Sequence, residues 1–342
     1  MITKRVVVAL ALMATVACGD DDGDSGGDGG SAGEGANEAG SGGSSGDGAA
    51  GEGGTGAEEQ VARGQYLVDH VIACSDCHTP RGPEGPMLDL YMAGAECFAE
   101  LPNGSCLNTP NLTNHETGLA NRTDEEIKTM ITQGLRPSAA GNEPLHPAMP
   151  YYVFANTSED DLDAIIAYLR TIEGVDNAVP RSGPEFEVEA PVDPIDPDTI
   201  PMPAEDYPEQ EAALRGRYLT SQVGLCIECH TPHQMSATVL DPATYFQGGE
   251  SFDLGLPVVP VSKNITSDPA TGIGDWTVDE IVAVLKEGVD SDGAGICPPM
   301  PAGPMAAYGG LTDDDARDMA HYLKSLPAIE NEIEDMCTWP PM

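Results

Sequence analysis

The feature that most constrains this 342-residue chain is a seven-residue motif, Cys-x-x-Cys-His-Thr-Pro, which occurs at residues 74–80 and again at 226–232. An upstream motif, Arg-Gly-x-Tyr-Leu, recurs at the same spacing, at residues 63–67 and 215–219. Downstream, an Asn-Leu/Ile-Thr motif, a Thr-Gly pair and a Tyr-Leu pair also recur with little drift in spacing. This pattern indicates a tandem duplication, so we expect one type of domain to be present twice.

Each copy contains the same helix signals. Capping boxes at Thr123–Glu126 and Thr277–Glu280 predict helices that end at Gly134 and Gly288. The other predicted helices precede each Cys motif, over residues 58–70 and 209–222, or follow the N-cap residues Ser158 and Thr312. Strand signals are sparse, so we expect an all-α fold. Its loops are long and rich in Pro and Gly and bury little apolar surface, so we expect a bound group to fill part of each core.

The Cys-x-x-Cys-His spacing places two thiols on one helical turn, where they can form thioethers with the vinyl groups of a haem. The adjacent imidazole then faces the iron as its proximal ligand. A redox dithiol or half of a zinc site is the alternative reading, but the trailing His and the matched second copy favour haem. The predicted attachment residues are Cys74, Cys77 and His78 for one haem c, and Cys226, Cys229 and His230 for a second.

Methionine is the common distal ligand of haem c iron. Met149 lies in Pro-Ala-Met-Pro, and Met300 lies in Pro-Pro-Met-Pro at the equivalent place in the second copy. We expect both to bind iron, with Met305 as the rival of Met300. The remaining imidazoles considered, which are expected to be surface or loop residues, are those of His115, His146, His233 and His321.

The N-terminus reads as an export signal. Residues 1–18 contain Lys4 and Arg5, then a short apolar run that ends before Cys18. The end of this run is typical of a bacterial lipoprotein, in which Cys18 would carry the lipid, although cleavage by an ordinary signal peptidase stays open. Residues 19–57 are nearly all Gly, Ser, Ala, Asp and Glu, which predicts a disordered tether. We therefore expect a lipoprotein held on the periplasmic or cell-surface side of a Gram-negative bacterium.

The chain is strongly acidic. It has 57 acidic and 15 basic residues, a net charge of −42 and a pI near 4.1. Without residues 1–59 the rest of the chain still has 46 acidic against 13 basic residues. Such a surface repels nucleic acid and anionic lipid and favours basic partners. We therefore exclude nucleic-acid binding and expect contact with the membrane only through the lipid on Cys18.

Four further cysteines remain for an oxidising compartment. Cys97 and Cys106 lie close together in one loop-rich insertion, Cys297 lies beside Met300, and Cys337 is near the C-terminus. The even number predicts the disulfides 97–106 and 297–337. Free buried thiols are the alternative.

Together these motifs resemble the class I cytochrome c domain, over about residues 60–180 and 210–330. The chain also resembles the cytochrome subunits of bacterial membrane-associated alcohol and sugar-acid dehydrogenases. Those subunits usually hold three haems and end in a membrane-binding segment, whereas this sequence has two motifs. In that fold the first and last helices cross closely, so the resemblance implies that Gly64 and Gly216 let Tyr168 and Tyr322 approach. The predicted organisation is signal 1–18, tether 19–57, cytochrome c domain 58–180, Pro-rich acidic linker 181–208 and cytochrome c domain 209–342.

Iron held by His and Met on both sides has no open position for a substrate. We therefore expect a diheme electron carrier, not an enzyme, that moves single electrons between redox partner proteins. One alternative is a diheme enzyme of the peroxidase or thiosulfate-oxidising type, with one haem open or not ligated by Met. Another is the electron-accepting subunit of a dehydrogenase complex whose catalysis lies on another polypeptide.

Overall fold

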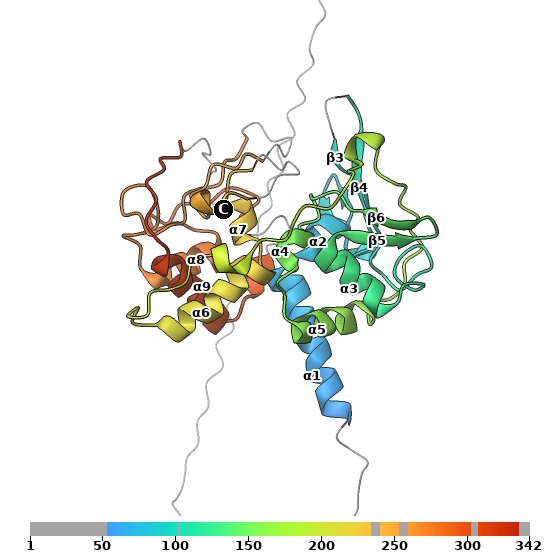
Figure 1. The fold of residues 1–342 in the computed structure, drawn as a ribbon, viewed down its shortest axis with the longest axis horizontal. Helices are drawn as coiled ribbons and strands as arrows, with labels where there is room; N and C mark the ends of the chain where they lie inside the picture. Colours follow the sequence, from blue (N-terminus) through green and yellow to red (C-terminus); the bar gives the residue numbers. More distant parts are fainter. Residues whose placement is uncertain (1–52, 101–102, 234–239, 253–258, 302–306, 335–342) are drawn as a thin grey trace, which may run out of the picture. The chain divides into compact units, whose positions relative to one another are not determined.

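The computed structural model of the chain describes residues 53–100, 103–233, 240–252, 259–301 and 307–334. These residues belong to one compact unit (Figure 1). Three residues with predicted roles, Cys18, Met305 and Cys337, lie outside the described residues, as do the predicted signal and most of the predicted tether. The last tether residues, 53–57, form the start of the first helix.

The two halves have the same order of helical elements. In the first half these are α1 (Gly53–Tyr66), the π-helical turn η1 (Leu67–Val71), α2 (Cys74–His78), α3 (Asp124–Gln133), α4 (Tyr151–Phe154) and α5 (Glu159–Leu169). In the second half they are α6 (Gln210–Tyr218), the π-helical turn η5 (Leu219–Val223), α7 (Cys226–Cys229), α8 (Val278–Glu287), the 3₁₀ turn η7 (Ala307–Gly310) and α9 (Asp313–Ser325). Further 3₁₀ turns are η2 (Leu88–Leu90), η3 (Pro184–Phe186), η4 (Pro197–Thr199) and η6 (Pro242–Thr244).

The predicted helix signals act as expected. Thr123 and Glu126 form a complete capping box at the start of α3, and Thr277 and Glu280 form another at the start of α8. Both helices end in a left-handed glycine, as predicted. The third and last helices of each half are therefore defined locally, by caps that the sequence displays.

Short strands were not predicted. The first half contains three antiparallel hairpins: β1 (Arg81–Gly82) with β2 (Gly85–Pro86), β3 (Ala95–Glu100) with β4 (Cys106–Thr109), and β5 (Leu135–Ser138) with β6 (Gly141–Pro144). Within the described part of the second half, only isolated bridges occur, between Ser251 and Val261 and between Val289 and Gly295. The helices still form the body of each half, and the hairpins order the loops of the first.

The first and last helices of each half cross at a glycine. A Cβ on Gly64 of α1 would lie 1.8 Å from the carbonyl oxygen of Ala164 on α5, and one on Gly216 of α6 would lie 1.9 Å from that of Asp318 on α9. The close neighbour is thus helix backbone; the Tyr168 Cβ comes third at 2.9 Å, and Tyr322 is not among the three nearest atoms at Gly216. Close helix approach is confirmed, but it does not depend on the tyrosines as expected.

The two halves also contact each other through matched residues. Tyr66 on α1 donates its hydroxyl to Asp315 of α9 at 2.5 Å, and Tyr218 on α6 donates to Asp161 of α5 at 2.7 Å. The hydroxyl oxygen of Tyr218 also accepts a hydrogen bond from the backbone amide of Ser158, the N-cap residue of α5. The hydroxyl oxygen of Tyr66 accepts one from the backbone amide of Thr312, the N-cap residue of α9. These reciprocal tyrosine contacts join the start of the last helix in each half to the first helix of the other.

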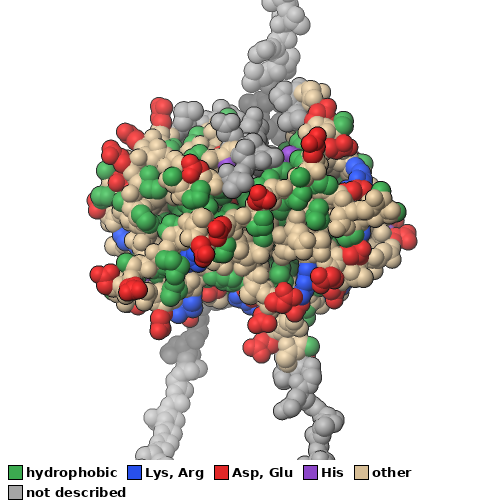
Figure 2. Space-filling view, viewed as in Figure 1, with side chains coloured by type: hydrophobic (Ala, Val, Ile, Leu, Met, Phe, Trp, Pro, Cys, Tyr) green, Lys and Arg blue, Asp and Glu red, His purple; other side chains and the backbone are tan. Residues whose placement is uncertain are grey.

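The core is built from both halves and from the segment that joins them. Ile195 and Ile200, which follow the first half, are as buried as the helix residues. Acidic side chains are prominent along the edge of the face shown in Figure 2. In the described ranges, no helix has the length and hydropathy needed to span a bilayer.

Candidate haem sites

The first Cys-x-x-Cys-His motif occupies α2, just after the π-helical turn η1. Cys74 and Cys77 are not joined in a disulfide, and burial raises the pKa of each thiol to about 12. They are therefore neutral thiols on a single turn of helix. This is the arrangement needed for two thioether bonds to one macrocycle.

The histidine of this motif has one nitrogen fixed by the fold. The Nδ1 atom of His78 lies 2.9 Å from the carbonyl oxygen of Pro110. A carbonyl can only accept, so Nδ1 carries the proton and Nε2 has the free lone pair that a metal requires. Burial lowers the pKa of His78, which keeps the imidazole neutral. The donor set therefore fits a covalently attached haem, which would supply an iron that changes oxidation state by one electron.

The second motif has the same geometry. Cys226 and Cys229 lie on α7, are not in a disulfide, and have thiol pKa values raised by burial. The next residue, His230, is buried, and its Nδ1 lies 2.7 Å from the carbonyl oxygen of Lys263. Burial lowers the pKa of His230 as well. The residues of both halves thus fit the same prosthetic group.

The Asn-Leu/Ile-Thr motif positions these carbonyl groups. Asn111 directly follows Pro110, and its Oδ1 accepts hydrogen bonds from the amide and the hydroxyl of Thr113. Asn264 directly follows Lys263, and its Oδ1 accepts hydrogen bonds from the amide and the hydroxyl of Thr266. Sequence reasoning gave these residues no role, although their recurrence in both copies was a signal of one.

The side-chain amides of the same two asparagines tie the histidine-binding loop to the segment that follows the last helix of each half. Asn111 Nδ2 donates to the carbonyl of Val175 at 2.8 Å, and Asn264 Nδ2 donates to that of Ile329 at 2.7 Å. Both asparagines are 3% exposed, so each is a buried and fully used hydrogen-bonding group.

The predicted distal ligands lie in equivalent loops. Met149 is between β6 and α4, and Met300 is in the loop after α8; both side chains are partly buried against the hydrophobic core. The Met149 amide donates to the carbonyl of His146, and the Met300 amide donates to that of Cys297, each at 3.1 Å. Met305, the rival of Met300, lies outside the described residues.

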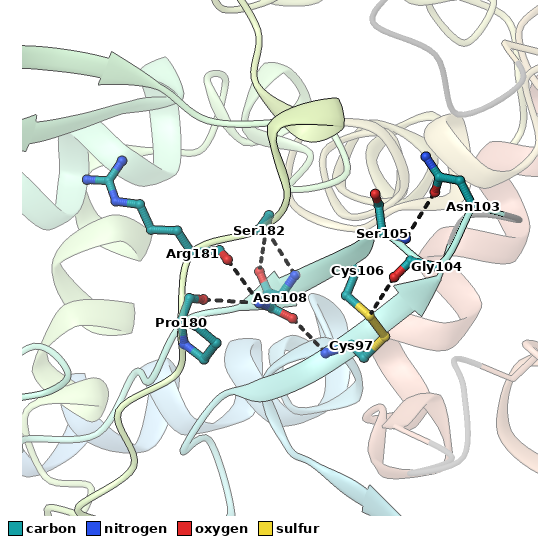
Figure 3. The surroundings of a disulfide bond; sticks show 9 residues. All are labelled: Cys97, Asn103, Gly104, Ser105, Cys106, Asn108, Pro180, Arg181 and Ser182. Carbon is teal, nitrogen blue, oxygen red and sulfur yellow. Dashed lines mark hydrogen bonds between the residues drawn. A yellow bond between two sulfur atoms is a disulfide. The ribbon is translucent and has the colours of Figure 1, made fainter.

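One of the two predicted disulfides lies wholly within the described residues. Cys97 and Cys106 are joined across the β3–β4 hairpin (Figure 3). Cys297 is also in a disulfide, and its expected partner, Cys337, lies outside the described residues. Free thiols are therefore excluded at Cys97, Cys106 and Cys297.

Two histidines lie in settings that the sequence does not indicate. His233, expected to be a surface or loop residue, lies in a loop, where its side chain is 2% exposed and its Nε2 lies 3.1 Å from Glu228. His70, which was not singled out, meets the second half: its Nδ1 is 3.0 Å from the carbonyl of Ala307, and its ring occupies the space beside Gly310. In the described parts of the chain, no group of three or more His, Cys, Asp or Glu residues is arranged to hold a metal ion.

Comparisons with known proteins identify a family for part of the chain. The family model for cytochrome c matches residues 61–173. The chain is 30% identical over 295 residues to the cytochrome c subunit of the quinone alcohol dehydrogenase of Gluconobacter oxydans, covering 80% of this chain and 56% of that protein. It is 30% identical over 283 residues to the fructose dehydrogenase cytochrome subunit of Gluconobacter japonicus, covering 78% and 53%.

A third relative is of similar length. The chain is 27% identical over 284 residues to a diheme cytochrome c-type protein of Cereibacter sphaeroides, covering 75% of this chain and 83% of that one. By contrast, the chain spans little more than half the length of the dehydrogenase subunits. Residues 61–173 are a cytochrome c domain, and the chain is a homologue of the cytochrome subunits of bacterial alcohol and fructose dehydrogenases.

Proposed function

We propose that this chain is an exported diheme c-type cytochrome that transfers single electrons between protein partners. The observation that carries the proposal is the pair of matched sites. In each, two buried thiols on one helical turn precede a histidine whose Nδ1 is held by a backbone carbonyl. We infer that both sites hold haem c, with His78 and Met149 on one iron and His230 and Met300 on the other.

Saturated iron suits electron transfer. A His and a Met ligand on opposite sides leave no position for a substrate, and the protein's task is to bury the haem and set its potential. His78 and His230, each neutral and fixed by one hydrogen bond, would hold a haem iron in a set orientation. A change of one electron at that iron would then need little rearrangement of these side chains.

Transfer between the two haems is part of the proposal. The hydroxyl of Tyr152 in the first half lies 3.4 Å from Glu228, between the two cysteines of the second motif. Burial raises the pKa of the Cys77 thiol in the first motif, and the negative charge of Glu228 in the second motif adds to that rise. The two attachment motifs therefore face the boundary between the halves, which favours a short path from one haem to the other.

The setting is also inferred. The apolar N-terminal run before Cys18 supports export and lipid attachment, with the body on the periplasmic or cell-surface side. The strongly acidic chain favours partners with basic docking surfaces. A role as the electron-accepting subunit of a dehydrogenase is the second candidate, favoured by the relatives that are named as such subunits.

The test uses the purified holoprotein. Intact mass before and after removal of haem iron, together with a pyridine haemochrome assay, should give two covalent haems per chain. The double variant Cys226→Ser/Cys229→Ser should retain one, and Cys74→Ser/Cys77→Ser should retain the other. A wild-type chain with a single haem would refute the diheme proposal.

Ligation separates a carrier from an enzyme. Optical and EPR spectra of the ferric protein should show two low-spin haems with Met–iron signatures, and the ferrous protein should not bind CO. One high-spin haem, or one that binds CO, would instead favour the diheme enzyme. Met300→Ala and Met305→Ala then decide which methionine serves the second iron.

A further inference from the structure

The segment that joins the halves, residues 180–201, is bound along its length; we call it the strap. At its start, the side-chain amide of Asn108 on β4 donates to the carbonyls of Pro180 and Arg181, at 3.2 Å each. The hydroxyl of Ser182 accepts a hydrogen bond from the backbone amide of Asn108 at 2.9 Å (Figure 3). The sequence predicts a Pro-rich acidic linker over residues 181–208, and the structure ties its start to the β3–β4 hairpin.

The middle of the strap lies on the residues that directly follow Met149 and Pro150. The amide of Val192 donates to the hydroxyl of Tyr151 at 2.8 Å. The amide of Ile195 donates to the carbonyl of Tyr152 at 3.0 Å, and the Ile195 carbonyl accepts from Asn156 at 2.8 Å. With 2% of its surface exposed, Ile195 is a core residue of this contact.

The strap also meets the other side of the methionine. The ring of Phe186 stands edge-on to the ring of His146, with centroids 5.5 Å apart. His146 lies three residues before Met149, and Tyr151 lies two residues after it. The strap therefore contacts both flanks of the short loop that presents the thioether.

That loop is closed mostly on itself. The amide of Met149 donates to His146, and its carbonyl accepts the amide of Tyr151 at 2.8 Å. These bonds fix the shape of the turn, and its place relative to the rest of the half is set by what holds its flanks. The strap contacts both flanks, through the ring of Phe186 on one side and through hydrogen bonds to Tyr151 and Tyr152 on the other.

The end of the strap belongs to the second half. Ile200 is 1% exposed, and its carbonyl accepts a hydrogen bond from Arg217 on α6 at 3.1 Å. The carbonyl of Pro201 accepts the hydroxyl of Tyr322 on α9 at 3.0 Å. Ile195 and Ile200 are thus two equally buried isoleucines on one segment. Ile195 lies by the Met149 loop, and Ile200 lies on the second half.

We propose that the strap positions the distal ligand of the first haem, and that Ile195 and Tyr151 are its positioning residues. The inference rests on the proposed function, since it concerns Met149 as an iron ligand. A thioether is a neutral, soft ligand, so its bond to iron depends on a loop that holds it in place. Loosening the strap should let Met149 leave the iron, which lowers the potential of that haem and opens a position for an external ligand.

The test compares Ile195→Ala with Ile200→Ala in the full holoprotein. Both remove the same atoms from sites of equal burial, so they serve as matched controls for loss of packing. The readouts are the upfield ε-methyl resonances of the haem-bound methionines in the ferrous protein, the midpoint potentials of both haems, and CO binding. Met149→Ala identifies which resonance and potential belong to the first haem.

Ile195→Ala should weaken the Met149 resonance, lower only the first haem's potential, and raise the fraction of ferrous protein that binds CO by about ten-fold. That change corresponds to a loss of about 1.4 kcal/mol in Met–iron ligation. Ile200→Ala should leave all three unchanged, and Ile195→Val should largely restore them. If Ile195→Ala fails to fold, Tyr151→Phe, which removes only the hydroxyl bonded to Val192, should show the same changes in smaller degree.

The outcomes separate the two proposals. A wild-type protein without a Met149 resonance would refute the assignment of the distal ligand, and with it the inference. A wild-type resonance that neither Ile195→Ala nor Tyr151→Phe alters would overturn the inference alone. Equal loss of the resonance in Ile195→Ala and Ile200→Ala would overturn it as well, because the effect would then be one of general stability.

Discussion

At the residue scale, the closest approach in each half depends on the absence of a side chain. Gly64 and Gly216 place helix backbone against helix backbone, and beside each of them an arginine forms a two-pronged ion pair with the crossing helix. Arg63 binds Asp161 at 2.8 and 3.0 Å, and Arg215 binds Asp318 at 2.6 and 2.9 Å. The Arg-Gly pair thus has the same role in both halves. The glycine sets the distance between the crossing helices, and the arginine fixes their register.

Gly64→Ala should therefore be strongly destabilising. The new methyl group would meet the carbonyl of Ala164, so α1 and α5 must separate, at a cost of about 3 kcal/mol or more. Gly56→Ala on the same helix meets nothing within 4 Å and should be neutral or slightly stabilising, because Ala favours helix. Urea unfolding of the two holoproteins measures both. Similar midpoints would show that the crossing can relax.

A second residue-scale prediction concerns Glu143 on β6. Hydrogen bonds from Arg181 and Arg136 lower the pKa of this carboxyl to about 2. A lowered pKa means stability that is present above the ordinary value near 4.5 and is lost as pH falls toward 2. Glu143→Gln should therefore unfold at lower urea than wild type at pH 6, and the difference should vanish by about pH 2. Glu189→Gln, which removes an exposed charge from the strap, should show no such trend.

At the element scale, the sequence could predict those features whose determining residues lie close together in the chain. The attachment motifs, the capping boxes and the Gly helix ends were found because their partners lie within a few residues. The hairpins were missed because their strands are two to six residues long and contain little alternation. The burial of His233 depends on Glu250, 17 residues away, whose carboxylate accepts the His233 amide at 2.8 Å. The strap was missed for the same reason, since Ile195 and Tyr152 are far apart in sequence.

The β3–β4 hairpin should depend on its disulfide. Cys97 and Cys106 close a loop of nine residues, for which chain entropy predicts a stabilisation of about 2–3 kcal/mol. Cys97→Ser/Cys106→Ser should lower the free energy of unfolding by that amount while leaving the haem content unchanged. Adding a thiol reductant to this double variant then reports on the Cys297 disulfide alone. No change in unfolding between wild type and variant would show that the hairpin is held by its strand bonds.

At the scale of the whole molecule, charge is the dominant property. With 57 acidic and 15 basic residues, the chain as a whole has a strongly negative field. Such a field raises the rate of encounter with cations and lowers it with anions, and salt screens both effects. Selection of a redox partner therefore begins before contact.

Small redox reagents of opposite charge test this directly. Reduction of the ferric protein by a hexaammineruthenium cation should slow by roughly ten-fold or more between about 10 mM and 500 mM salt. Reduction of the ferric protein by ferrocyanide, or oxidation of the ferrous protein by ferricyanide, should be slow at low salt and become faster as salt is added. Stopped-flow absorbance at the haem bands gives both rates. Equal salt dependence for the two reagents would contradict electrostatic steering.

The reciprocal tyrosine contacts have a consequence for how such chains can grow. Tyr66 of the first half binds the start of α9 in the second half, and Tyr218 of the second half binds the start of α5 in the first. Both copies of this contact surface are therefore already used within the chain. The pair is closed in the way that a two-fold dimer is closed. If a further domain of the same type were added to this chain, both copies of this contact surface would already be in use. That domain would have to bind through a different face. Duplication can thus produce a pair on this surface, but it cannot produce a row.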